Sequence, residues 1–269
     1  MRVITLDGFP QAGKTRSGSA MAEELSSEFA VHFGTAGSFF RTVTAAVIEE
    51  LGQENEARIV ASETKLDDAI CAVLEKDIVH DTRRDWGNLC RPAISNLVPV
   101  VSKRQTVQKA GQGWYQRTAK NAEDSGTEIL IVDGRNPRAR LLDWMNEGKG
   151  ESVLDLFITC SVEEAARRSL AASSDCKPTQ QELSTECASI LKRRQLDMTR
   201  EHRPLQLPIY PVEFVPEFDD VVHVVDSSNK LANGDGIPKT ILFETTYVAK
   251  QDMTCQAISL AKAALSLVD

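Results

Sequence analysis

Apolar and polar positions follow two alternating patterns along this chain. Short, almost continuously apolar runs rich in β-branched residues are typical of strands covered on both faces. Such runs occupy residues 3–7, 29–33, 128–133, 153–159 and 221–226. Between them, apolar residues recur at helical spacing over residues 14–25, 37–51, 92–123 and 162–172. This alternation predicts an α/β protein with a mainly parallel sheet sandwiched between helices.

The C-terminal part of the chain has a different pattern. Residues 83–88 and 229–240 are rich in turn-forming side chains, and the second stretch could join the run 221–226 to the apolar segment after it in a hairpin. Residues 252–268 predict a closing helix packed on the sheet. Its expected apolar face consists of Cys255, Ile258, Ala261, Leu265 and Val268.

Composition narrows the class of protein. With 269 residues, 42% apolar and 26% charged, the chain can bury a sizeable core, and we expect a single domain over 1–269. The net charge of −8 disfavours nucleic acid or an anionic membrane as the main partner. The six cysteines have no metal-like spacing, and no apolar segment reaches membrane-spanning length. We therefore expect a cytoplasmic monomer.

The stretch GFPQAGKT follows the first predicted strand and opens the first predicted helix. Glycines let the backbone N–H groups curl inward, a lysine reaches the outer phosphates, and a helix N-terminus favours an anion. The alternative is an ordinary strand-to-helix turn. The stretch predicts an ATP-binding loop made of Gly8, Phe9, Pro10, Gln11, Ala12, Gly13, Lys14 and Thr15, with the Thr15 hydroxyl available to Mg²⁺.

Four further stretches decide between classes of phosphate-binding protein. They are TAGSFFR (35–41), IVDGRN (131–136), LFITCSVEEAARR (156–168) and KRRQLDMTREHRPL (192–205). In identity, order and spacing, this set resembles bacterial cytidylate kinases. These are P-loop kinases that transfer the γ-phosphoryl group of ATP to CMP or dCMP. The resemblance runs from residue 2 to about residue 226.

The resemblance implies a fold, a cofactor and an activity. The fold would be a P-loop NTPase three-layer sandwich with a parallel five-stranded sheet. A monophosphate-binding insertion would occupy about 50–117, and a helical lid about 176–204. ATP with Mg²⁺ would be the donor, and the products would be CDP or dCDP. The alternatives are a kinase for another monophosphate or a small alcohol, and a nucleotide-binding regulatory relative without turnover.

Phosphoryl transfer requires cations on both phosphates. Besides Lys14, the candidates for the acceptor phosphate are Arg41 and Arg135, which match the family's arginines; for each the alternative is a solvated surface side chain. Lys109 falls near a further arginine of the family. Asp133 ends a buried strand, and we expect it to act toward Mg²⁺ or as a structural helix cap.

The segment 192–203 is unusually basic for an acidic chain. Arg193, Asp197 and Arg200 are spaced to share one helical face. They match the family's lid, whose arginines close over the phosphates and whose aspartate contacts the sugar. An ordinary surface ion pair between Arg193 and Asp197 is the alternative.

Two residues depart from the family pattern at the base pocket. Ala36 stands where the family has a serine or threonine, and Asn136 where it has an aspartate that contacts the base amino group. Both departures affect base recognition and leave the phosphate-binding residues intact. The reaction type is therefore better defined by the sequence than the acceptor base.

Overall fold

The computed structural model describes residues 1–52, 62–76, 89, 92–171, 177–198, 222–225, 240–245 and 250–266. The chain divides into two compact units, one comprising Met1–Gly34 with Ala119–Asp269 and the other Thr35–Thr118. The predicted insertion, 50–117, lies inside the second unit.

The first unit is built on one sheet. Its strands lie in the order β2 (Val31–Thr35), β3 (Ile129–Asp133), β1 (Arg2–Gly8), β4 (Glu151–Thr159), β6 (Thr240–Glu244) and β5 (Val222–Val225). β1 pairs in parallel with β3 and β4, and β4 pairs in parallel with β6. The predicted α/β class is confirmed, but the sheet has six strands among the described residues, with β5 antiparallel, where a parallel five-stranded sheet was predicted. The apolar run 221–226 contributes the antiparallel strand β5, which pairs with β6 as the predicted hairpin requires.

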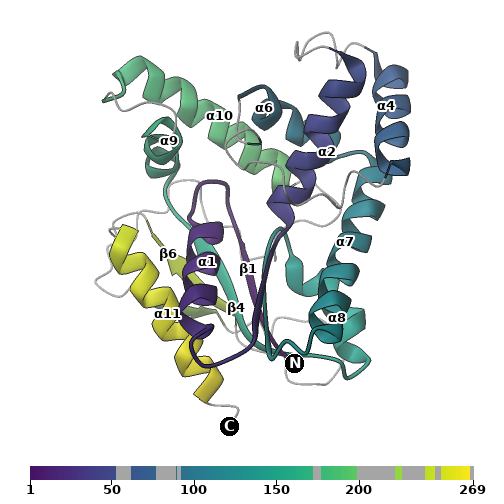
Figure 1. The fold of residues 1–269 in the computed structure, drawn as a ribbon. Helices are drawn as coiled ribbons and strands as arrows, with labels where there is room; N and C mark the ends of the chain where they lie inside the picture. Colours follow the sequence, from purple (N-terminus) through teal and green to yellow (C-terminus); the bar gives the residue numbers. More distant parts are fainter. Residues whose placement is uncertain are drawn as a thin grey trace. The chain divides into compact units, whose positions relative to one another are not determined.

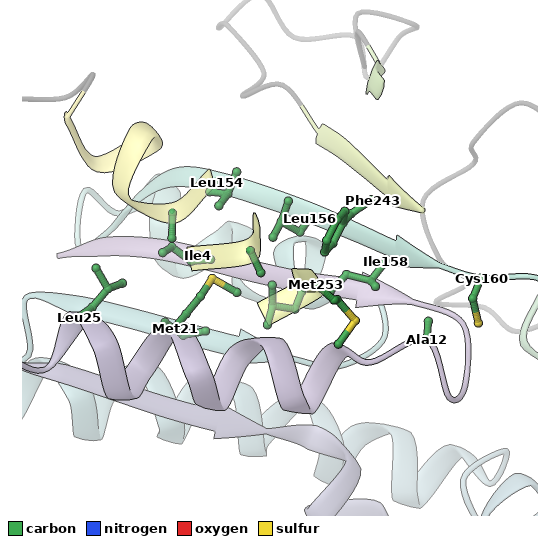
Figure 2. Packing of buried hydrophobic residues seen from close by; sticks show 14 of the residues in the cluster. Ile4, Ala12, Met21, Leu25, Leu154, Leu156, Ile158, Cys160, Phe243 and Met253 are labelled. Atoms are coloured by element: carbon green, nitrogen blue, oxygen red, sulfur yellow. The ribbon is translucent and has the colours of Figure 1, made fainter. Parts of the chain in front are cut away.

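Helices cover both faces of this sheet. α1 (Lys14–Leu25) and α11 (Lys250–Ser266) lie side by side on one face (Figure 1). Alternate residues of β1 and β4 point toward them, and Figure 2 shows Ile4, Leu154 and Leu156 packed near Met21 and Leu25 of α1. α8 (Pro137–Asn146) contacts β1 and β4 from the other face, where Trp144 packs near Val3 and Gly150.

The face of α11 differs in part from the prediction. Its buried side chains are Met253, Ala257, Ala261 and Leu265. Cys255 is exposed, so its predicted place in the core is wrong, and Val268 lies outside the described residues. The helix begins two residues earlier than predicted, and Met253 takes the core position at its N-terminal end.

Two more helices follow β4 in the first unit. α9 (Val162–Ala171) carries Arg168, and α10 (Gln180–Met198) carries the first part of the predicted lid and packs against α9. Arg200 and the rest of the predicted lid after Met198 lie outside the described residues, as do the predicted loops 83–88 and 229–239.

The second unit is helical. It contains α2 (Ala36–Leu51), α4 (Glu63–Glu75), α6 (Pro92–Val101) and most of α7 (Gln105–Asp124). The predicted continuous helix over 92–123 is two helices, separated by a turn at 102–104. Phe39, Val43, Leu66, Ile70 and Leu97 belong to its own apolar core. Among the helices of the described residues, none has the length and apolar character needed to cross a membrane.

Candidate active site

The loop between β1 and α1, which the sequence predicts to bind phosphate, has three residues with positive φ. Gly8, Gln11 and Gly13 have φ values of 133°, 61° and 105°. Glycine is required at position 8 for space as well, because a Cβ there would lie 1.9 Å from the carbonyl oxygen of Ile158 on β4. Gln11 is a non-glycine residue in the left-handed region, which is uncommon and costly for most side chains.

Lys14 folds back over the start of this loop. Its Nζ donates hydrogen bonds to the carbonyl oxygens of Gly8 and Phe9, each at 2.9 Å. The ammonium group therefore lies beside the backbone that curls between β1 and α1. This is the place where a lysine can neutralise phosphate oxygens held by the loop.

Thr15 and Asp133 meet although 118 residues separate them along the chain. The Thr15 hydroxyl, in the first turn of α1, donates to Oδ2 of Asp133 at the end of β3. Asp133 is 3% exposed. A hydroxyl and a carboxylate side by side at the phosphate-binding loop are the oxygen donors that Mg²⁺ prefers, so the residues fit this ion. Across the described residues no cluster of three or more His, Cys, Asp or Glu side chains is positioned to hold a metal.

Asp7 is a buried carboxylate that the sequence reasoning missed. Its Oδ1 accepts the backbone N–H of Gly8 at 2.6 Å, and its Oδ2 accepts the backbone N–H of Asn136 at 3.1 Å. One side chain thus joins the phosphate-binding loop to the loop after β3. The signal was present in the sequence, since Asp7 ends a buried apolar run as Asp133 does.

Burial is the largest influence on Asp7 and raises its pKa from 3.8 to about 6. The hydrogen bond from Gly8 and the positive charge of Lys14 act in the opposite direction. The Asn136 hydrogen bond and the charge of Arg135 also lower the pKa. Arg135 is therefore electrostatically coupled to the carboxylate that supports the phosphate-binding loop.

Asn136 has a backbone role besides any contact with a base. Its φ and ψ are 48° and 50°, in the left-handed region, and it occupies the N-cap position of α8 without a side-chain hydrogen bond to the helix. Asparagine and aspartate tolerate this conformation better than other side chains with a Cβ. The residue type at position 136 is therefore constrained by the turn from β3 into α8 as well as by chemistry.

Two arginines hold the outer side of the phosphate-binding loop, and the sequence reasoning assigned neither a role. Arg168 of α9 donates from Nη1 to the carbonyl oxygens of Gln11 and Ala12, at 3.5 and 3.4 Å. It also donates to Thr245 Oγ1 at 3.0 Å, and Thr245 Oγ1 in turn donates to Ala12 O at 3.1 Å. Arg168 lies within the stretch 156–168, where its pairing with the loop had no local sequence signal.

Arg194 is the second of these arginines. Its guanidinium lies over the ring of Phe9, 4.6 Å from the ring centroid, and its Nη2 donates to the Cys160 carbonyl oxygen at 2.8 Å. Figure 2 shows Cys160 and Ala12 near each other at this end of the sheet. α10 is thereby attached to the phosphate-binding loop and to the end of β4.

The remaining predicted lid residues are described in part. Arg193 is half-buried on α10, next to Arg194. The helix continues through Met198, so the expected helical spacing of Arg193 and Asp197 is confirmed, while the side chain of Asp197 lies outside the described residues. The role of these residues toward phosphate stays a prediction.

The other acceptor-side predictions fall in the second unit. Ala36 is the buried first residue of α2. On the same helix, Nη1 of Arg41 donates to the Leu89 carbonyl oxygen and to Ser95 Oγ, both at 2.9 Å. Lys109 is exposed on α7. The guanidinium of Arg41 is thus fixed by hydrogen bonds to Leu89 and to Ser95 of α6, so Arg41 is not a solvated surface side chain.

Comparison with known proteins agrees with the geometry of the loop. The family model described as cytidylate kinase matches residues 4–225. The chain belongs to the cytidylate kinase family. The match spans the phosphate-binding loop, both Asp133 and Arg135, and the helices that carry Arg168 and Arg193.

Curated relatives of this family member are distant and longer. The chain is 27% identical over 236 residues to a bifunctional pantoate ligase/cytidylate kinase of Parasynechococcus marenigrum (strain WH8102), covering 84% of the chain and 42% of that protein. It is 26% identical over 244 residues to the protein of the same description from Synechococcus sp. (strain CC9311), covering 85% and 44%. The chain thus spans less than half the length of these relatives.

One solved structure is similar along nearly its whole length. It is a putative kinase from Chloroflexus aurantiacus, with 13% identity, a TM-score of 0.43 and coverage of 98% of this chain and 96% of that one.

Proposed function

We propose that this member of the cytidylate kinase family is a nucleoside monophosphate kinase that converts ATP and CMP or dCMP into ADP and CDP or dCDP. The observation that carries the proposal is the meeting of three groups around one loop. Lys14 lies on the loop carbonyls, and the Thr15 hydroxyl bonds to the Asp133 carboxylate. A nucleotide-binding relative without turnover would have no need of this full set.

The donor half of the reaction follows from this set. The backbone N–H groups of the loop would hold the ATP phosphates, and Lys14 would neutralise the charge that develops as the γ-phosphoryl group leaves. Mg²⁺, held by Thr15 and through water by Asp133, would supply additional positive charge to the ATP phosphates. Asp7 would keep the loop in its curled form through the N–H of Gly8.

The acceptor half rests on cations assigned from the family pattern. Arg135, Arg41 and Lys109 would hold the acceptor phosphate, and one of its oxygens would attack the γ-phosphorus while the bond to the ADP leaving oxygen breaks. The lid residues Arg193, Arg200 and Asp197 would close over the phosphates and the sugar. Ala36 and Asn136 would line the base pocket.

A coupled assay of ADP release over a panel of nucleoside monophosphates tests the proposal. CMP and dCMP should give the highest kcat/KM with ATP and Mg²⁺, and Lys14→Met is the matched inactive control. Highest activity with another monophosphate would identify a different acceptor and contradict the CMP assignment. No ADP release with any monophosphate would contradict the kinase function itself.

A further inference from the structure

A third buried carboxylate, besides Asp7 and Asp133, lies on the opposite face of the sheet from the α1 and α11 core. Asp155 is on β4, 2% exposed, and directly opposite Thr5 of β1 in the strand register. Thr5 donates its hydroxyl to Asp155 Oδ1, and Ser152 donates to the same oxygen at 3.3 Å. None of the assigned roles in phosphate binding uses this aspartate.

The charge of Asp155 is compensated from α8. Nε of Arg138, in the first turn of that helix, is 3.1 Å from Asp155 Oδ2, and the arginine side chain is only 17% exposed. Burial raises the pKa of Asp155, while the Arg138 charge and the Thr5 hydrogen bond lower it. Removing one partner of a buried ion pair leaves the other charge uncompensated, which is strongly unfavourable. The pair therefore links the start of α8 to the middle of β4 by charge attraction, since Arg138 Nε and Asp155 Oδ2 are close without hydrogen-bond geometry.

Arg135 lies three residues before Arg138, and the backbone on both sides of it is fixed. On one side, Gly134 N–H donates to the Leu6 carbonyl oxygen at 3.0 Å. On the other, Asn136 N–H donates to Asp7, and Pro137 restricts the backbone at the first helical position. Arg138 supplies the next attachment along the chain. The side chain of Arg135 thus extends from a backbone segment that is hydrogen-bonded to β1 on both sides of Arg135 and linked to β4 through Arg138.

We propose that the Asp155–Arg138 ion pair is a positioning device for Arg135, fixing the turn from β3 into α8 so that this arginine is oriented toward the acceptor phosphate. The inference rests on the proposed kinase function. Neither member of the pair contacts substrate. The pair acts through the backbone of residues 134–138. Arg138, which the ion pair anchors to β4, lies about one helical turn after Arg135.

The test compares variants in the intact chain. Arg138→Met removes the charge while keeping most of the apolar stem, and Asp155→Asn keeps the volume and the hydrogen-bond partners of the carboxylate. Arg138→Lys retains a positive charge as the conservative variant. Leu141→Ala, a fully buried position on the same helix, is the control for a loss of stability that leaves the ion pair intact.

The decisive measurement is whether the ion-pair variants impair use of the acceptor more than binding of ATP. A misplaced binding group lowers efficiency roughly 10- to 100-fold. In Arg138→Met and Asp155→Asn we expect kcat/KM for the acceptor to fall by about that factor while the KM for ATP changes less than about twofold. Arg138→Lys should recover part of the loss. Leu141→Ala should lower the melting temperature without this difference between the acceptor and ATP.

Hydrogen exchange supplies a readout independent of turnover. The amides of Gly134 and Asn136 should exchange faster in Arg138→Met than in wild type, and the amides of α1 should not. If wild type transfers phosphate but both ion-pair variants alter the kinetic parameters for the acceptor and for ATP equally, the positioning role is wrong and the kinase function stands. If wild type transfers phosphate to no monophosphate, both the kinase function and this inference fall.

Discussion

Asp7 accepts the backbone N–H of Asn136 at 3.1 Å, across 129 residues of sequence. The same carboxylate accepts the N–H of Gly8 through its other oxygen. The loop expected to hold the phosphate donor and the loop that carries Arg135 are therefore joined by one buried acid. The ionisation of this acid makes the stability of the site depend on pH.

The first prediction concerns that pH dependence. Because burial raises the pKa of Asp7 from 3.8 to about 6, the folded protein holds this proton more tightly than the unfolded chain. The contribution of Asp7 to the free energy of unfolding therefore falls as the pH rises from about 4 to about 6, and is constant at higher pH. The Asp7→Asn variant has no such proton to lose.

Urea unfolding of wild type and Asp7→Asn across pH 4 to 8 measures this contribution. The unfolding free energy of wild type relative to the variant should decrease by up to about 3 kcal/mol between pH 4 and pH 7. Titrations of other groups, including Asp155, are common to both proteins and cancel. A difference that is the same at every pH would contradict the prediction.

The second prediction concerns Lys14. Replacing it by methionine removes the charge that we expect to face the transferring phosphate, and kcat should fall by about 10²- to 10³-fold. Lys149→Met is the control, because Lys149 is an exposed lysine paired with Glu147. Steady-state turnover and melting temperature should be measured together. Near wild-type turnover of folded Lys14→Met would exclude the assigned role.

The third prediction concerns Asn136 and base choice. An amide can present a donor or an acceptor, whereas a carboxylate only accepts. Asn136→Asp should therefore raise kcat/KM for CMP relative to UMP, with little change in the KM for ATP. Asn136→Gly, which keeps the left-handed backbone but lacks the amide, should give no such gain. The prediction is lost if wild type already rejects UMP as sharply as the aspartate variant does.

The fourth prediction concerns the stack of Arg194 on Phe9. A cation over an aromatic ring contributes about 0.5–1 kcal/mol at a partly exposed site. A double-mutant cycle with Phe9→Leu and Arg194→Met should give a coupling of this size in the free energy of unfolding. A coupling within error of zero would mean that the ring of Phe9 adds nothing to the hydrogen bonds that Arg194 donates to the carbonyl oxygens of Cys160 and Ser161.

The parts of this fold that local sequence defines were predictable. α1 begins at Lys14 and ends at Leu25 as expected, because the glycine-containing loop fixes its start. The contact between Thr15 and Asp133 was not predicted, because it depends on β1 and β3 being neighbouring parallel strands.

Other features depend on pairings that the sequence does not encode locally. Arg138 and Asp155 pair only because α8 packs against β4. Arg168 reaches the phosphate-binding loop only because α9 lies beside that loop. The division at 102–104 was missed because apolar helical periodicity continues on both sides of it.

The antiparallel strand β5 has a consequence for the sheet beyond the site. Among the described strands it is the outermost on its side, and it has four residues where its neighbour β6 has five. An unpaired strand edge is a template for pairing with another chain, and very short edge strands limit this hazard. By covering β6, β5 replaces a five-residue outer strand with a four-residue one on this side of the described sheet, which shortens the run of backbone groups through which one molecule could add to the sheet of another and begin to aggregate.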